Sequence, residues 1–224
     1  MFLITGASSG IGAATARAAR AAGYQVVLAA RSADKIDALA AELGSDNALA
    51  VPCDVTEFDQ QQALVAAALQ RFGRIDVAFA NAGFGAARGF QSETVEHWRS
   101  MVLTNVYGCA LTIRATMDAL KDSRGHLLLT GSVAGRRALS GSLYSATKFA
   151  VTAMGEAARQ EYTGTGVRVT LIEPGMTDTP FFDSGAGEGA LTPDDVARAV
   201  IYAVSQPPHV DVNELLIRPT AQPD

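Results

Sequence analysis

The sequence has few of the residues that mark disulfide frameworks and metal sites. It contains two cysteines, Cys53 and Cys109, and three histidines, at positions 97, 126 and 209. Both cysteines fall in segments that read as core, which is typical of small apolar residues in a reducing cytosol rather than of a disulfide framework. Because the histidines show no metal-ligand spacing, we expect no metal site.

Basic runs and long apolar segments are also missing. The formal net charge is −5 at pH 7 and there is no Lys/Arg run, which argues against nucleic acid or an anionic membrane as a partner. The apolar segment 2–4 is followed at once by Thr5 and Gly6, so neither a charged leader nor a membrane-spanning length is evident. We therefore expect a soluble, cytoplasmic protein.

The chain does contain enough apolar sequence for a sizeable core. Hydrophobic residues make up 48% of the 224 positions, which fits one domain covering residues 1–224. Apolar runs alternate with helical segments, and strands are expected at residues 2–4, 24–30, 49–51, 75–80, 127–129, 166–173 and 215–217. This alternation predicts an α/β fold with one doubly wound parallel sheet of about seven strands and helices on both faces.

A glycine-rich turn follows the first expected strand. Residues 5–12 read Thr-Gly-Ala-Ser-Ser-Gly-Ile-Gly and lead into an Ala-rich helix. Glycines let the backbone approach a pyrophosphate, and free N–H groups at a helix N-terminus favour anionic oxygens. The spacing differs from the common dinucleotide pattern, and a flexible loop with helix-capping serines is the alternative. The predicted cofactor contacts in this turn are Gly6, Ser8, Ser9, Gly10, Ile11 and Gly12.

The end of the second expected strand indicates which dinucleotide binds. An NAD-specific site usually places an acidic residue there to bind the ribose 2′-hydroxyl, but this chain has Ala30 followed by Arg31. A guanidinium can bind a 2′-phosphate through two parallel hydrogen bonds. We therefore predict NADP(H) as cofactor, held by Arg31 and Ser32. The alternative is that Arg31 is a solvated charge at the start of the next helix, which Ser32 caps.

Three further strand ends supply candidate cofactor contacts. Asp54 could accept from an adenine amino group or could be an ordinary turn residue. The small-residue turn at 81–83 could support a ribose, and the segment after residue 173 lies where the nicotinamide half would reach. The predicted contacts in these segments are Asp54, Val55, Asn81, Ala82, Gly83, Pro174, Gly175, Thr177 and Thr179.

The segment from Ser132 to Lys148 carries the candidate chemistry. Tyr144 and Lys148 are four residues apart, so on a helix their side chains share one face. An adjacent ammonium favours the phenolate, so we expect the pKa of Tyr144 to be lowered from ~10, by roughly three units where a nicotinamide ring adds a second cation. Ser132 follows an apolar strand and could hold a substrate oxygen while Tyr144 moves the proton. A Tyr-x-x-x-Lys pattern alone is frequent by chance, so this interpretation depends on the rest of the chain.

A long helical stretch at residues 93–122 places Asn105 among apolar neighbours, where its amide needs partners. A buried asparagine is commonly structural, but the Tyr144 and Lys148 pair leads us to assign Asn105 to a proton relay. The helix that continues from Tyr144 is apolar on more than one face. We therefore expect a homo-oligomer, a dimer or a tetramer, formed through the helices that carry Asn105 and Tyr144.

Two features concern the substrate. Arg88, Arg136 and Arg137 could each hold a substrate carboxylate, or they could be solvated, and we favour Arg137. Residues 178–191 contain three closely spaced glycines, a composition suited to a mobile lid.

Taken in order, these motifs resemble those of the short-chain dehydrogenase/reductase family, over essentially the whole chain. The resemblance implies a Rossmann fold with Tyr144 as general acid/base and Lys148 both lowering the pKa of Tyr144 and holding the nicotinamide ribose. It also implies that Ser132 orients the substrate carbonyl and that Asn105 anchors a water in the proton relay. The matching motifs are the turn at residues 5–12, Asp54, Asn81-Ala82-Gly83, Asn105, Ser132, Tyr144 with Lys148, and Pro174-Gly175.

The closing stretch at residues 210–221 is similar to that of the NADP-dependent 3-hydroxy-acid, or serine-type, dehydrogenase branch. This resemblance implies hydride transfer between NADP(H) and a small secondary alcohol or ketone, including 3-hydroxy acids such as serine or allo-threonine. The lid is shorter and richer in glycine than that branch would suggest. Alternatives are a broader carbonyl or 3-oxoacyl reductase, and a non-catalytic NADPH-binding regulator.

Overall fold

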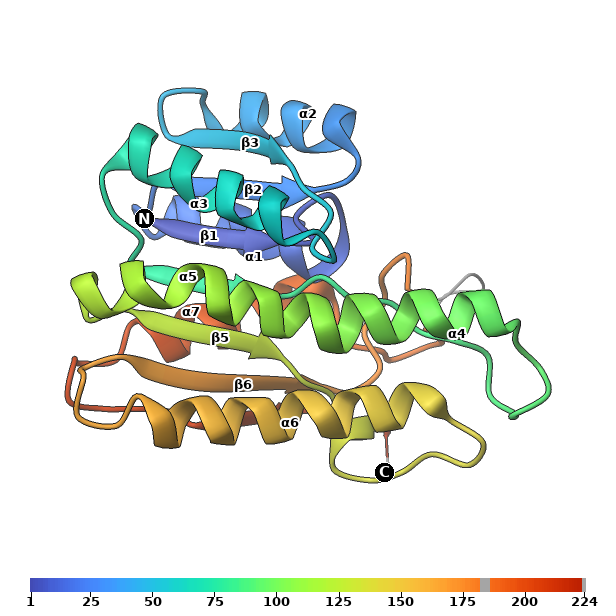
Figure 1. Ribbon diagram of the computed structural model, residues 1–224. Helices are drawn as coiled ribbons and strands as arrows, with labels where there is room; N and C mark the ends of the chain where they lie inside the picture. Colours follow the sequence, from blue (N-terminus) through green and yellow to red (C-terminus); the bar gives the residue numbers. More distant parts are fainter. Residues whose placement is uncertain (182–185, 223–224) are drawn as a thin grey trace.

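The computed structural model describes residues 1–181 and 186–222. Within them the chain forms one seven-stranded parallel sheet in the order β3-β2-β1-β4-β5-β6-β7 (Figure 1). The predicted doubly wound sheet of about seven strands is therefore confirmed. The strands are β1 (Phe2–Thr5), β2 (Val26–Ala30), β3 (Ala48–Pro52), β4 (Val77–Ala80), β5 (His126–Thr130), β6 (Arg168–Pro174) and β7 (Glu214–Ile217).

Helices cover both faces of the sheet. One face packs against α1 (Gly10–Ala21), α2 (Ala33–Leu43) and α7 (Pro193–Val204). The other packs against α3 (Phe58–Phe72), α5 (Cys109–Ser123) and α6 (Leu143–Glu161), which lie in front of the sheet in Figure 1. The predicted long helical stretch is α4 (Val95–Val102), which passes through a π-helical turn, η1 (Leu103–Gly108), into α5.

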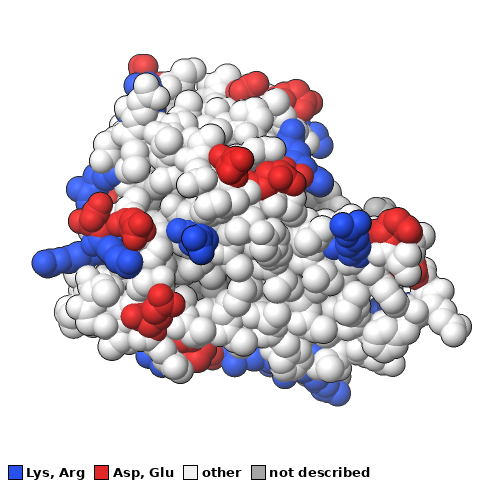
Figure 2. All heavy atoms as spheres, in the orientation of Figure 1, with Lys and Arg blue, Asp and Glu red and all other residues white. Residues whose placement is uncertain are grey.

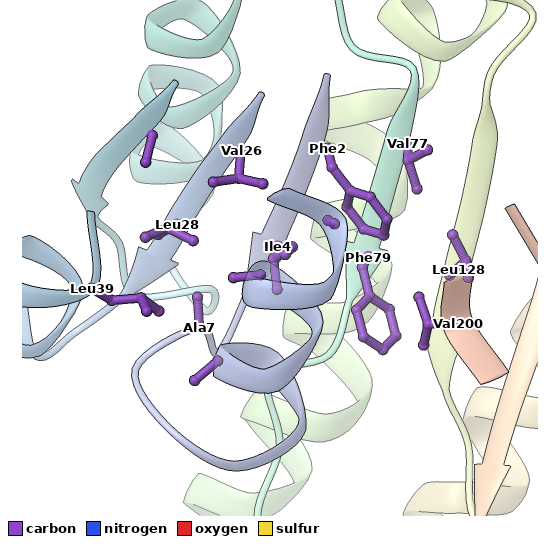
Figure 3. Close-up of a cluster of buried hydrophobic side chains, with 14 of the residues drawn as sticks. Phe2, Ile4, Ala7, Val26, Leu28, Leu39, Val77, Phe79, Leu128 and Val200 are labelled. Atoms are coloured by element: carbon purple, nitrogen blue, oxygen red, sulfur yellow. The ribbon is translucent and has the colours of Figure 1, made fainter. Parts of the chain in front are cut away.

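The core has two layers because successive side chains of a strand point to opposite faces. Phe2 and Ile4 pack on the α1 side together with Phe79 and Leu128 (Figure 3). Leu3, which lies between Phe2 and Ile4, packs on the α3 side. A strand covered on both faces reads as a continuous apolar run, which is why these strands could be predicted.

Within the described residues, side-chain caps begin three of the α-helices, α4, α6 and α7. Thr192 and Asp195 form a capping box at the start of α7, and Ser142 caps α6 by accepting from Ser145 N. Thr56 does not cap α3. Its hydroxyl donates to Asp54 Oδ1 (2.8 Å) instead, and α3 begins one residue later than a Thr56 cap would place it.

The parallel strands place all their carboxyl ends at one edge of the sheet. The strand order reverses at β1, whose neighbours are β2 on one side and β4 on the other. In such sheets the connections diverge at this switch point and leave a crevice, which is where ligands bind. Among the helices of the described ranges, none has the length and apolarity needed to cross a membrane.

Candidate active site

A cavity of about 800 Å³ lies at the carboxyl edge of the sheet. It is built from the segments that follow all seven strands, so residues far apart in the chain meet there. It contains nearly every residue predicted to touch a cofactor. Its lining comprises residues 6, 8–11, 30–32, 53–55, 81–86, 88, 104, 130–134, 139, 142, 144, 148, 174–177, 179–181 and 222.

The glycine turn lines one wall of this cavity. Gly6 and Gly10 have positive φ angles of 66° and 51°, which glycine adopts without strain. Gly12, also predicted as a cofactor contact, does not line the cavity, and that prediction is corrected. A Cβ at Gly12 would lie 2.3 Å from Gly6 O and 2.8 Å from Asn81 Nδ2, so its lack of a side chain lets α1 pack against the turn.

The end of β2 supplies Ala30, Arg31 and Ser32 to the lining, and Arg31 is exposed. Ser32 occupies the N-cap position of α2 but makes no side-chain capping bond to the described residues of that helix. Asp54 has the turn role considered as its alternative, since its Oδ1 accepts from Thr56 N (3.0 Å). Asp54 also lines the cavity, so contact with a ligand is compatible with the turn role.

Asn81 joins the ends of three strands. Its Nδ2 donates to Thr5 O (3.0 Å), and its Oδ1 accepts from Thr130 Oγ1 (3.1 Å). Thr5 Oγ1 accepts from Asn81 N (3.0 Å) and Ala82 N (3.2 Å). Neither threonine was predicted to take part in the site, although each ends a buried strand, a position where a hydroxyl can bond to the next turn.

Ser132, Tyr144 and Lys148 converge on one wall of the cavity. Ser132 lies beside Tyr144, and interaction with its hydroxyl acts to lower the pKa of the phenol. Ser132 Oγ also accepts from Ala134 N (3.1 Å) and donates to Pro174 O (3.5 Å). Lys148 is 5% exposed and donates from Nζ to Thr130 O (2.7 Å), which places Nζ 5.6 Å from the centre of the Tyr144 ring. A hydroxyl, a phenol and an amine therefore meet at the carboxyl end of β5.

The direction of the Tyr144 pKa shift corrects the prediction. Burial raises the pKa of Tyr144 to about 12, and only its hydrogen bond with Ser132 acts to lower it. Burial lowers the pKa of Lys148 to about 8. The ammonium donates to a backbone carbonyl rather than to the phenol oxygen, and desolvation dominates the pKa of Tyr144.

Asn105 is buried within the π-helical turn η1 and does not line the cavity. Its amide accepts from Phe84 N (3.0 Å) and donates to Phe84 O (2.8 Å) and Thr147 Oγ1 (3.2 Å). A Cβ at Gly83 would lie 3.1 Å from Asn105 Oδ1 and 3.8 Å from Lys148 Nζ. Asn105 thus fixes the loop after β4 beside Lys148, and its role in a proton relay stays a prediction.

The three candidate arginines have different surroundings. Arg136 is paired with Glu173 and Glu214, so its assignment as a substrate ligand is not supported. Arg137, the favoured candidate, is exposed and does not line the cavity. Arg88 does line it.

The part of the cavity beside Tyr144 has an apolar wall. The ring of Phe181 meets that of Tyr144 edge-on at 5.3 Å. A Cβ at Gly85 would lie 2.5 Å from Phe181 Cζ, so this glycine makes room for the ring. Leu139, Met176 and Gln222 also line the cavity and were not predicted.

The predicted lid, residues 178–191, lies partly outside the described residues, since residues 182–185 are not among them. Its far end returns to the cavity loop, because Thr177 and Leu191 pair in an isolated bridge. Asp178 N donates to Leu191 O (2.7 Å) and Leu191 N donates to Met176 O (2.9 Å). The described ends of the segment are therefore joined beside the cavity.

Comparison with known proteins identifies the family of this chain. The family model of short chain dehydrogenases matches residues 1–186, and the chain belongs to that family. It is 41% identical over 221 residues to an uncharacterized oxidoreductase of Staphylococcus haemolyticus, covering 97% of this chain and 96% of the relative.

Two solved structures share the fold over nearly the whole chain. One is an alcohol dehydrogenase from the archaeon Thermococcus sibiricus complexed with 5-hydroxy-NADP, with a TM-score of 0.91, 33% identity, and coverage of 98% of this chain and 96% of that one. The other is the closed form of a serine dehydrogenase complexed with NADP⁺, with a TM-score of 0.92, 31% identity, and coverage of 99% and 95%.

Proposed function

We propose that this protein is an NADP(H)-dependent oxidoreductase that transfers a hydride between the nicotinamide and a small secondary alcohol or ketone. A single domain, residues 1–224, carries both cofactor binding and catalysis. The observation that carries the proposal is that Ser132, Tyr144 and Lys148 share one cavity with the glycine turn. The two similar dehydrogenases with NADP-type ligands support the same cofactor for this chain.

The residues of the cavity fit NADP(H). Close backbone approach at Gly6 and Gly10 suits the pyrophosphate, and α1 begins at Gly10 with its free N–H groups. Arg31 and Ser32 are placed to hold a 2′-phosphate, with no carboxylate at Ala30 to repel it. Asp54 and Val55 would hold the adenine, residues 81–83 and Lys148 the ribose, and Pro174, Gly175, Thr177 and Thr179 the nicotinamide half.

The proposed mechanism assigns one task to each catalytic side chain. In carbonyl reduction Tyr144 donates its phenol proton to the carbonyl oxygen, which Ser132 holds by a hydrogen bond. Lys148 holds the ribose and supplies positive charge near Tyr144. NADP(H), when bound, would supply the hydride chemistry. A pKa of about 12 keeps Tyr144 protonated at neutral pH, which suits its role as the acid in reduction.

The surroundings of Tyr144 limit the substrate. Leu139, Met176 and Phe181 offer apolar contacts, and Arg88 offers a positive charge at the same cavity. This combination supports a small 3-hydroxy acid, such as serine or allo-threonine, with the carboxylate at Arg88. A broader carbonyl or 3-oxoacyl reductase is the second candidate, supported by the apolar wall. A non-catalytic NADPH-binding regulator would not need the three catalytic groups together.

A substrate panel tests the proposal. Reduction of NADP⁺ is followed with serine, the threonine isomers, simple 3-hydroxy acids and uncharged secondary alcohols, and oxidation of NADPH with ketones and 3-oxoacyl thioesters. Turnover of hydroxy acids that weakens in Arg88→Ala supports the 3-hydroxy-acid assignment. Turnover limited to uncharged ketones or thioesters supports the second candidate, and no turnover with any of them overturns the proposed activity.

We also propose that the protein forms a homo-oligomer through α4, η1 and α6. Val95 (67% exposed) and Tyr107 (50%) are large apolar or aromatic side chains on the first two, and Phe149 (43%) lies on α6. Figure 2 shows charged side chains of both signs scattered over the face formed by α3, α5 and α6, with uncharged side chains across much of its middle. Such a surface suits contact with a second copy.

A further inference from the structure

Glu173 is a buried carboxylate to which the proposed mechanism gives no task. It lies on β6 next to Pro174, its side chain is 1% exposed, and it does not line the cavity. Its Oε2 has no hydrogen-bond partner among the described residues. A buried charge is costly unless it is paired. The burial of this carboxylate therefore depends on the interactions that its other oxygen, Oε1, makes.

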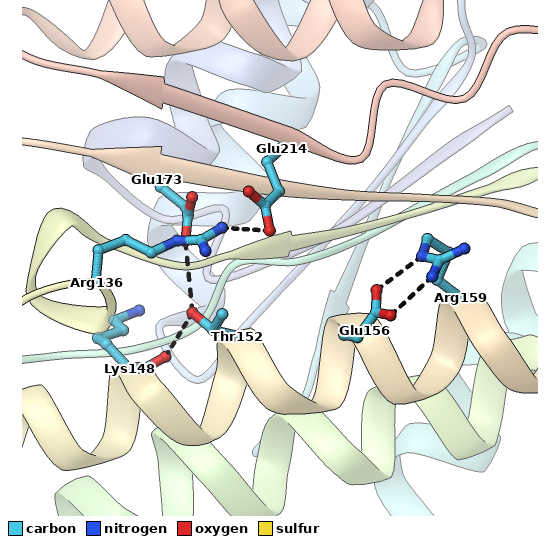
Figure 4. Close-up of polar contacts among 7 residues, drawn as sticks. All are labelled: Arg136, Lys148, Thr152, Glu156, Arg159, Glu173 and Glu214. Carbon is cyan, nitrogen blue, oxygen red and sulfur yellow. Dashed lines mark hydrogen bonds and ion pairs between the residues drawn. The ribbon is translucent and has the colours of Figure 1, made fainter.

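The first of these interactions runs to the turn that carries Ser132. Arg136 donates from Nε to Glu173 Oε1 (2.7 Å), and another of its nitrogens pairs with Glu214 on β7 (Figure 4). Arg136 immediately follows the short 3₁₀ helix η2 (Val133–Gly135), for which Ser132 is the N-cap. The arginine therefore ties the far end of the Ser132 turn to β6 and β7.

The second interaction runs to the helix that carries Tyr144 and Lys148. The Thr152 hydroxyl lies 3.4 Å from Glu173 Oε1 and 3.2 Å from Lys148 O, and it shares its proton between them (Figure 4). Thr152 is one turn after Lys148 on α6. The same carboxylate oxygen thus contacts both elements that supply the catalytic groups.

Two glycines allow this close packing. A Cβ at Gly131 would lie 2.8 Å from Glu173 Cγ, and one at Gly135 would lie 2.7 Å from Lys148 O. A side chain at either position would push the Ser132 turn away from β6 or from α6. The turn is therefore held between Glu173 and the backbone of Lys148.

We propose that Glu173 is a positioning residue, which sets the place of Ser132 relative to Tyr144 and Lys148 through Arg136 and Thr152. This inference depends on the proposed function, because it concerns the geometry of that reaction. Glu173 does not line the cavity, and its side chain makes no hydrogen bond to a residue that lines it. It therefore acts only through Arg136 and Thr152.

Glu173→Gln tests the inference, since it keeps the volume and removes the charge. The hydrogen bond from Ser132 lowers the pKa of Tyr144, so a displaced Ser132 moves the alkaline rise of the oxidation rate to higher pH. We expect this displacement of the pH profile, a fall in kcat of between about tenfold and about a hundredfold, and an unchanged Kd for NADPH. Arg136→Ala should have the same effect, and the double variant should add little to either single change.

A matched control comes from the other ion pair drawn in Figure 4. Glu156→Gln removes the exposed ion pair with Arg159 on α6, the helix that carries Tyr144. The pH profile of this variant should coincide with that of the wild type. Glu173→Asp keeps a carboxylate, so its kcat should fall less than that of Glu173→Gln. If Glu173→Gln does not fold, Thr152→Val and Arg136→Ala provide the same readout.

Two results separate failure of this inference from failure of the proposed function. An unshifted pH profile and an unchanged kcat per folded enzyme in Glu173→Gln, whatever its melting temperature, would show that Glu173 only supports the fold. A wild-type enzyme that turns over no alcohol or ketone with NADP(H) would instead overturn the proposed function on which the inference depends.

Discussion

Burial decides the charge state of the central tyrosine. The pKa of Tyr144 is raised to about 12 and that of Lys148 is lowered to about 8, both chiefly by desolvation. Oxidation of an alcohol needs the phenolate as base, whereas reduction needs the phenol as acid. We expect the oxidation rate to rise between about pH 6 and about pH 8, where Lys148 keeps its charge, and the reduction rate to be level there. Initial rates in both directions across the pH range check this, and an oxidation rate already at its plateau at about pH 6 would be inconsistent with it.

Arg31 is the residue proposed to set the cofactor preference. Arg31→Ala removes the charge-assisted hydrogen bonds proposed for the 2′-phosphate, so the Kd for NADPH should rise by about tenfold to a hundredfold. The Kd for NADH should stay within about twofold, because NADH has no 2′-phosphate. Arg71→Ala is the control, since Arg71 hydrogen-bonds to backbone carbonyls of residues 45 and 46 and does not line the cavity. An equal rise in the Kd for NADPH and for NADH would show that Arg31 does not bind the 2′-phosphate.

The sequence predicts single site residues well where the signal is local. Residues that follow a strand, such as Ser8 or Asn81, could be placed because all parallel strands end at one edge. The choice of Arg137 is not supported, because Arg88 and not Arg137 lines the cavity. Arg136 is paired with Glu173 and Glu214 on other strands, which the sequence does not reveal. The direction of the Tyr144 shift was also wrong, because the degree of burial depends on the whole fold.

At the scale of elements, strand β5 contains a buried histidine. His126 is fully buried, and its Nε2 lies 2.6 Å from Thr170 Oγ1 on β6. Burial, with Arg168 nearby, lowers its pKa to about 3. The unfolded chain therefore takes up this proton first as pH falls, at about pH 6.5, so the stability that depends on neutral His126 is present above that pH and is lost below it.

This linkage predicts that the free energy of unfolding falls between about pH 6.5 and about pH 3. His126→Gln should make this fall less steep, even if it lowers stability at neutral pH. His209→Gln, at an exposed position, is the control. Urea unfolding at a series of pH values measures the slope, and the same slope in His126→Gln and wild type would contradict the assignment.

The ends of helices could be predicted where the residues that fix them are adjacent in the sequence, and not where those residues belong to other segments. The Thr192 box marks the start of α7 in the sequence itself. The π-helical turn that buries Asn105 was not foreseen, because it is fixed by contacts with Phe84 and Thr147 in other segments.

At the scale of the whole molecule, the alternation of strand and helix was sufficient to predict the sheet. The same pattern does not determine the oligomeric state, which has to be measured. Tyr107→Lys would place a charge on the uncharged helical surface and should shift the protein toward monomer. Tyr202→Lys, at a comparable exposed aromatic position on α7 on the opposite face of the sheet, should not. Analytical ultracentrifugation of the wild type and both variants measures this, and a monomeric wild type would rule the assembly out.

The proposed chemistry requires a proton on the Tyr144 oxygen beside a bound cofactor. Tyr144→Phe removes that oxygen and leaves the ring, and Tyr202→Phe, at an exposed position on α7, is its control. The decisive measurement is NADPH binding by calorimetry together with turnover of the best substrate. We expect Tyr144→Phe to bind NADPH within about twofold of the wild type and to lose turnover by about a hundredfold or more. Turnover that survives in Tyr144→Phe at the wild-type rate would contradict the account.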